Sequence, residues 1–151
     1  NFKNPKAGMA LTAAAGPASN LIMSVIFILL SNISFVIYCK TNDSIVARVA
    51  FLFFFYAAMI NISLAVFNLI PIPPLDGSRI VGLLIPNKIY YQIMKYERYI
   101  IIVVFVLLAL GWLSTPLSWL TYKVLYGISW LVSKPFGEYG DMFMQIVLSA
   151  M

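Results

Sequence analysis

Long apolar runs alternate with short polar segments along this chain. Residues 8–38 and 49–69 form two runs that are each long enough, at about 1.5 Å per helical residue, to cross a hydrocarbon core of about 30 Å. Residues 99–113 and 117–132 form two more runs, near the short end of that range. The pattern therefore predicts an all-α, polytopic membrane protein with about four transmembrane helices.

Small residues mark one face of the first predicted helix. Ala10, Ala14 and Ala18 recur every four positions, a spacing that lets a neighbouring membrane helix approach closely. The pair Gly16–Pro17 is expected either to kink this helix or to begin its membrane-spanning part.

The second run ends in a proline-rich segment that precedes an acidic residue. Residues 68–77 read N-L-I-P-I-P-P-L-D-G. Pro71 has no backbone N–H and would clash with the preceding turn of a continuing helix. Ile70 and Ile72 are pushed toward extended backbone because a proline follows each of them. The segment thus predicts a helix interrupted just before Asp76. Irregular backbone at membrane depth requires burial in protein or a wet cavity, and an ionisable residue there is a candidate functional residue.

Composition limits the classes of protein to which this chain can belong. It is 62% hydrophobic and 10% charged, whereas soluble domains are about 45–50% apolar and about 25% charged. We therefore expect a single membrane-embedded domain over residues 1–151, with core helices in 8–86, a helical hairpin in 99–133 and a tail in 134–151. The net charge of +5 comes from basic residues between the apolar runs, so the expected partner is the lipid bilayer and not nucleic acid.

Two residue types are scarce. Cys39 is the only cysteine, so no intramolecular disulfide can form, and the chain has no histidine. The chain begins at Asn1 without a signal-peptide pattern, and we expect it to be a piece of a longer protein.

The basic residues also predict an orientation. One expected side holds the N-terminus, the segment after Asp76 and the tail, and it carries Lys3, Lys6, Arg79, Lys88, Lys95, Arg98 and Lys134. The opposite side carries Lys40 and Arg48. The positive-inside rule then places Asp76 toward the cytoplasm in a multi-pass protein of the cell membrane. Residues 87–98, which are basic and rich in tyrosine, are predicted to lie at the membrane interface.

Asp76 has three interpretations from its local sequence. It can cap a short helix over Gly77–Ile85, which would contribute about 1 kcal/mol. It can instead ligate a metal ion, because a divalent cation compensates a carboxylate near membrane depth. A third interpretation makes it the ion or proton site of a small transporter or channel subunit. A catalytic zinc site uses about three protein ligands, so Asp76 would need two more from elsewhere.

Two motifs resemble those of one known family. Residues 68–77 are similar to the second signature of the site-2 proteases, a family of intramembrane zinc metalloproteases. Residues 16–20, G-P-A-S-N, resemble the G-P-x-x-N segment of that family. Residues 4–10 resemble the corresponding segment in the bacterial members of the family. The resemblance covers roughly residues 4–84, and the two motifs stand in the family's order, separated by one expected membrane crossing.

The resemblance implies a zinc-dependent peptidase. In this family the aspartate of the D-G pair is the third zinc ligand, which implies that role for Asp76. The other two ligands are the histidines of an H-E-x-x-H helix, whose glutamate is the general base. Because this chain lacks histidine, the resemblance implies that two further ligands lie upstream and that the isolated piece is inactive. The implied reaction is hydrolysis of peptide bonds in or near the membrane-spanning segments of membrane-anchored protein substrates.

Neighbouring residues receive roles from the same resemblance. Asn68 is expected to position the substrate or an oxyanion, and Ile70 and Ile72 to bind an unwound substrate strand. A further set is expected to shape the site: Gly16, Pro17, Asn20, Pro71, Pro73 and Gly77. The alternative function is a non-catalytic pseudoprotease that binds membrane segments, beside the transporter or channel subunit with Asp76 as its ion site.

Overall fold

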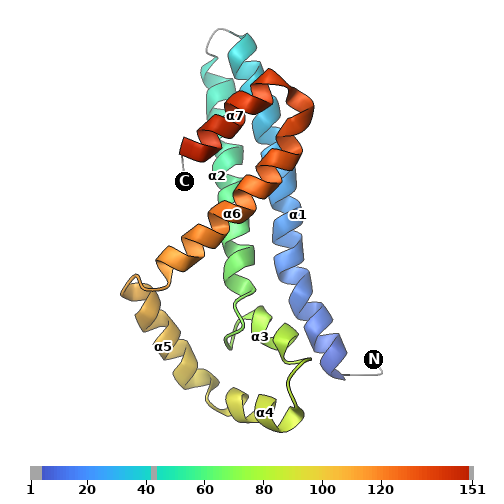
Figure 1. The fold of residues 1–151 in the computed structure, drawn as a ribbon, viewed down its shortest axis with the longest axis vertical. Helices are drawn as coiled ribbons and strands as arrows, with labels where there is room; N and C mark the ends of the chain where they lie inside the picture. Colours follow the sequence, from blue (N-terminus) through green and yellow to red (C-terminus); the bar gives the residue numbers. More distant parts are fainter. Residues whose placement is uncertain (1–4, 42–43, 150–151) are drawn as a thin grey trace. The chain divides into compact units, whose positions relative to one another are not determined.

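The computed structural model describes residues 5–41 and 44–149, and this part of the chain is helical without a β-strand (Figure 1). Lys3, one of the basic residues used for the orientation, and Asn4, the first residue of the segment 4–10, lie outside the described residues. The elements in chain order are α1 (Pro5–Lys40), α2 (Ile45–Asn68), α3 (Asp76–Val81), α4 (Asn87–Lys95), α5 (Glu97–Ala109), α6 (Ser114–Ser133), a short 3-10 helix (Lys134–Phe136) and α7 (Glu138–Ser149). The all-α prediction is confirmed.

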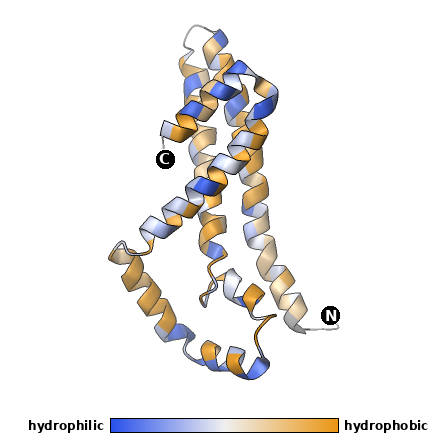
Figure 2. Ribbon diagram, in the orientation of Figure 1, coloured by the Kyte–Doolittle hydropathy of each residue, from blue (hydrophilic) through white to orange (hydrophobic). Residues whose placement is uncertain are grey.

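Two helices are long and apolar enough to cross a membrane. They are α1, over Ala7–Lys40, and α2, over Ile45–Asn68. Helices α5 and α6 meet the same criteria only when taken together as one bent span, which would raise the number to three. Figure 2 shows hydrophobic residues over most of α1, α2 and α5. The protein is thus a membrane protein, but the predicted number of four spans is not confirmed.

Helix α1 runs through Pro17 without ending. The helix therefore begins before Gly16–Pro17, and the expectation that its membrane-spanning part starts at this pair stays a prediction. Near its start, Ala10, Ala13 and Pro17 are buried, whereas Ala14 is half-buried and Ala18 is exposed. The predicted face was wrong because a helix has about 3.6 residues per turn, so a strict four-residue repeat drifts around the axis.

The chain divides into two units. The first comprises Asn1–Ser19 and Leu64–Ser118, and the second comprises Asn20–Ser63 and Trp119–Met151. The first unit thus holds the start of α1, the end of α2, all of α3, α4 and α5, and the first turn of α6.

A cluster of phenylalanine rings forms the core of the second unit. Phe143 of α7 lies 6.0 to 6.1 Å from the rings of Phe35, Phe51 and Phe55, measured between ring centroids. All four side chains are buried. The hydroxyl of Ser31 donates a hydrogen bond to the backbone oxygen of Phe51 at 3.1 Å, which links α1 to α2.

Helix α7 reaches this core through a tight turn. Gly137 has a φ of 56°, a conformation that glycine adopts without steric cost, and it ends the 3-10 helix. Gly140 then packs on the end of α6, where an added Cβ would lie 2.2 Å from the backbone oxygen of Ser133. The tail predicted over residues 134–151 therefore contains a packed helix of the second unit.

Candidate active site around Asp76

The proline-rich segment interrupts the helix where the sequence predicts. Helix α2 ends at Asn68, and α3 begins at Asp76. The backbone N–H of Leu69 still donates to Ala65 at 3.0 Å, and that of Ile70 donates to Phe67 at 3.2 Å. Pro71 has no N–H to offer, so the helical ladder stops there.

The segment between the two helices is folded into turns and is not the extended strip that the prolines suggest. The N–H of Ile72 donates to the oxygen of Ile70 at 2.8 Å, and the N–H of Leu75 donates to the oxygen of Ile72 at 2.9 Å. The other residues between them are prolines, so every backbone donor from Ile70 to Leu75 is used inside the protein. Only carbonyl oxygens remain for an incoming strand.

Asp76 occupies the first helical position of α3 and is not its cap. The cap residue is Leu75, with φ −68° and ψ 152°, and no side-chain hydrogen bond caps the helix. The capping interpretation of Asp76 is therefore wrong by one position, and the helix ends at Val81 instead of Ile85. A carboxylate in the first turn is still favoured by the helix dipole.

Two glycines bring Asp76 to its place within the first unit. A Cβ added to Gly16 of α1 would lie 3.2 Å from Oδ2 of Asp76, so the carboxylate lies against the bare backbone of α1. A Cβ added to Gly77 would lie 2.2 Å from the oxygen of Leu69 and 2.5 Å from that of Ile70. The first turn of α3 thus rests directly on the unwound end of α2, and the two sequence motifs meet at Asp76.

The remaining predicted site residues differ in how far they are buried. Asn68, Ile70 and Ile72 are half-buried at the end of α2 and in the turns that follow. Of the prolines predicted to shape the site, Pro17 and Pro73 are buried, and Pro71 is exposed. Asn20 is half-buried on α1, in the second unit. The chemical roles of all these residues stay predictions.

Ser78 is a site residue that the sequence analysis missed. It is buried, and its hydroxyl donates to the backbone oxygen of Leu75 at 2.7 Å, next to the backbone bond from the Ser78 N–H to the same oxygen at 3.0 Å. These two bonds tie the first turn of α3 to the turn before it. A serine two positions after the aspartate, at a helix start, was the available signal.

The chemistry of Asp76 fits one ligand of a zinc site. An ionised carboxylate is a pure acceptor and a known zinc ligand, and Gly16 leaves its Oδ2 uncovered by a side chain at that point. The described residues contain no group of three or more histidine, cysteine, aspartate or glutamate side chains that could hold a metal ion. A complete site needs further ligands from outside the described residues.

The comparisons with known proteins agree with both motifs. Residues 2–111, more than half of the chain, match the model of Peptidase family M50. The chain belongs to peptidase family M50. This family contains the site-2 proteases, so the resemblance found in the sequence is confirmed. The match extends past the predicted limit near residue 84 and covers all of α5.

Two curated relatives are named as putative zinc metalloproteases. The "Putative zinc metalloprotease YwhC" of Bacillus subtilis (strain 168) is 37% identical over 109 residues, covering 70% of this chain and 48% of the relative. The "Putative zinc metalloprotease all3971" of Nostoc sp. (strain PCC 7120 / SAG 25.82 / UTEX 2576) is 44% identical over 50 residues, covering 28% and 14%. The chain thus spans at most about half the length of these M50 relatives. No solved structure matches the chain.

Proposed function

We propose that this chain supplies one zinc ligand, Asp76, and part of the substrate site of an intramembrane metalloprotease. The enzyme hydrolyses peptide bonds in or near the membrane-spanning segments of membrane-anchored protein substrates. The observation that carries the proposal is the close approach of the Asp76 carboxylate to Gly16, at the point where an apolar helix unwinds. Membership of peptidase family M50 supports the type of reaction.

The position of Asp76 favours a bound cation. A carboxylate near membrane depth costs on the order of 3 kcal/mol unless it is compensated, and a divalent ion compensates it directly. Two histidines from outside this histidine-free chain complete the ligand set. When bound, zinc lowers the pKa of a coordinated water to about 7 and polarises a carbonyl group. The packed first turn of α3 keeps the carboxylate of Asp76 in position to bind that ion.

The unwound segment before Asp76 supports substrate binding. It can offer only carbonyl oxygens, since all backbone donors from Ile70 to Leu75 are used internally, and the oxygens of Ile70 and Ile72 already accept one such bond each. A substrate strand must therefore donate its own N–H groups to this segment, near Ile70 and Ile72. The amide of Asn68, at the end of α2, can donate to the substrate carbonyl. The basic residues predict that this site faces the cytoplasm.

An Asp76→Asn variant of the complete protein tests the proposal. Asparagine keeps the size of the side chain and removes the negative charge that binds the ion. We expect normal expression, zinc affinity lowered by more than the roughly 10–100-fold that loss of an outer-shell partner causes, and loss of cleavage of a membrane-anchored reporter. Zinc content by elemental analysis, expression level and reporter cleavage are the three measurements.

Gly16→Ala provides a graded second variant. The added Cβ would lie 3.2 Å from Oδ2 of Asp76, so the carboxylate must shift by a few tenths of an ångström. Alanine is a better helix former than glycine, so α1 should not be weakened. We expect about tenfold weaker zinc binding with unchanged thermal stability. Full cleavage activity and normal zinc content in Asp76→Asn would refute the ligand assignment.

A further inference from the structure

Helix α4 is amphipathic and has no buried residue. Successive helical residues are rotated by about 100°, which places Ile89 and Ile93 about 100° to 160° around the helix from Lys88 and Lys95. The side chains of Ile89 and Ile93 remain 48% and 36% exposed. Alternating hydrophilic and hydrophobic colours follow this short helix in Figure 2. A helix with this pattern and an uncovered apolar face is typical of the membrane interface.

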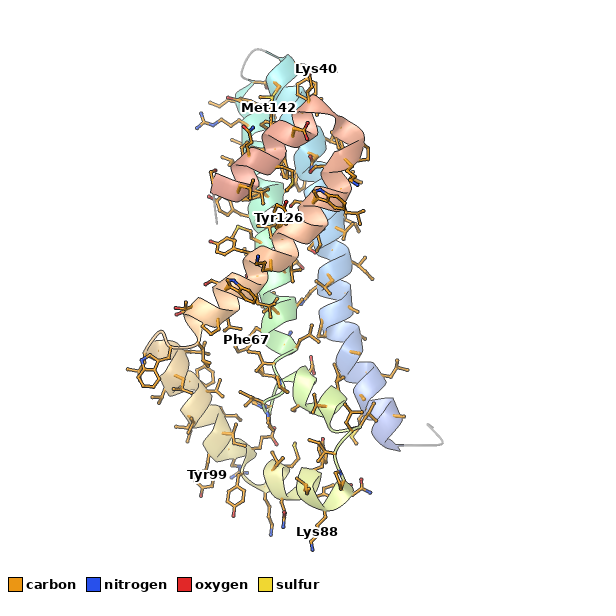
Figure 3. The ribbon with its side chains drawn as sticks, in the orientation of Figure 1. Lys40, Phe67, Lys88, Tyr99, Tyr126 and Met142 are labelled. Atoms are coloured by element: carbon orange, nitrogen blue, oxygen red, sulfur yellow. The ribbon has the colours of Figure 1, made fainter. Side chains whose placement is uncertain are left out.

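A contact with the turn after α3 determines which way α4 faces. Gly82 packs against Tyr90, and an added Cβ at Gly82 would lie 2.6 Å from Cε2 of that ring. Tyr90 is about 160° from Lys88 and about 140° from Lys95 around the helix. The two lysines therefore project away from the turn that follows α3. Figure 3 shows Lys88 projecting outward from the ribbon at this end of the first unit.

Helix α5 follows α4 after Tyr96 and also has an exposed apolar surface. Its residues Ile102 and Phe105 are 61% and 67% exposed. Exposed side chains of this kind on an apolar helix are compatible with hydrocarbon. The junction adds Arg98 and exposed Tyr99, so α4 and the start of α5 carry both aromatic and basic residues where lipid headgroups are expected.

We propose that α4 lies in the membrane interface and that Lys88, Lys95 and Arg98 bind the headgroups of anionic phospholipids. Residues 87–99 contain these three basic residues and one acidic residue, Glu97, which leaves a net charge of +2. Basic residues of this kind are attracted to anionic lipid, while the apolar face of the helix enters the acyl boundary. Charge complementarity therefore selects an anionic membrane surface as the occupant.

Lipid binding by the complete protein tests this surface. The protein is equilibrated in detergent micelles with phosphatidylglycerol or phosphatidylcholine. Native mass spectrometry then measures the affinity with which the first molecules of each lipid bind to the protein. The wild type is expected to prefer phosphatidylglycerol. In Lys88→Gln/Lys95→Gln, this preference should fall by roughly fivefold for each charge removed, and phosphatidylcholine binding should not change. Raised salt should weaken the same preference.

Lys123→Gln/Lys134→Gln is the matched control, because it removes two exposed lysines from α6 and the residue that follows it. It should keep the preference for phosphatidylglycerol. Equal binding of the two lipids by the wild type would refute the proposal, and so would an equal loss in both double variants. The measurement uses neither zinc nor proteolysis, so its failure is distinguishable from failure of the proposed protease function.

Discussion

Gly77 is the residue on which the position of Asp76 most directly depends. The atoms that a Cβ would meet there are backbone oxygens of Leu69 and Ile70, at 2.2 and 2.5 Å. A backbone group cannot move aside as the end of a long side chain can. Any side chain at this position must therefore lift the first turn of α3 off the end of α2, and Asp76 moves with it.

Gly77→Ala should destabilise the protein by about 1–3 kcal/mol or more, as overpacking of a tight contact does. Gly127→Ala is the control, because nothing lies within 4 Å of an added Cβ in the middle of α6. There the higher helix propensity of alanine should stabilise the helix by up to about 1 kcal/mol. Unfolding in detergent micelles measures both changes. Equal stability of the two variants would show that α3 does not rest on Leu69 and Ile70.

Among the elements, α7 is the one whose role the sequence left open, because it was described only as part of a tail over residues 134–151. Its amino acids form an apolar tail of 12 helical residues, too short to span a membrane. In the structure its buried face carries Gly140, Phe143 and Val147. Phe143 meets rings from both α1 and α2, so α7 holds these two long helices together within the second unit.

Phe143→Ala should cost about 3–5 kcal/mol, because it removes a fully buried ring and leaves a cavity between Phe35, Phe51 and Phe55. Phe105→Ala on α5 removes the same number of atoms from a side chain that is 67% exposed, and it should have a much smaller effect. Thermal unfolding of both variants in the same detergent gives the comparison. A cost for Phe105→Ala as large as that for Phe143→Ala would contradict the packing role of α7.

At the scale of the whole molecule, charge determines the expected orientation in the membrane. The basic residues after Asp76 outnumber Lys40 and Arg48, which lie at the end of α1 and in the first turn of α2, on either side of the connection between these helices. The positive-inside rule depends on such short loops near the ends of membrane helices. The site around Asp76 and helix α4 are therefore expected on the cytoplasmic side.

Cysteine labelling tests this orientation. In a Cys39→Ala background, Asn87→Cys places a thiol at the exposed first residue of α4, and Thr41→Cys places one at the exposed residue that follows α1. A membrane-impermeant maleimide should label Asn87→Cys from the cytoplasmic side only and Thr41→Cys from the other side only. The reverse pattern would overturn the orientation.

The sequence by itself determined the helical class, the two long apolar helices, the break before Asp76 and the family. Each of these follows from local properties: the length of an apolar run, the missing N–H of proline, or the order of residues in a motif. Local periodicity could not decide that Ala13 is buried while Ala18 is exposed, or that α7 joins a core of rings. The approach of Gly16 to Asp76, and of Gly77 to Leu69, was likewise decided by the tertiary structure. These features depend on contacts between segments far apart in the chain, where the close fit of backbone and side chains selects one arrangement.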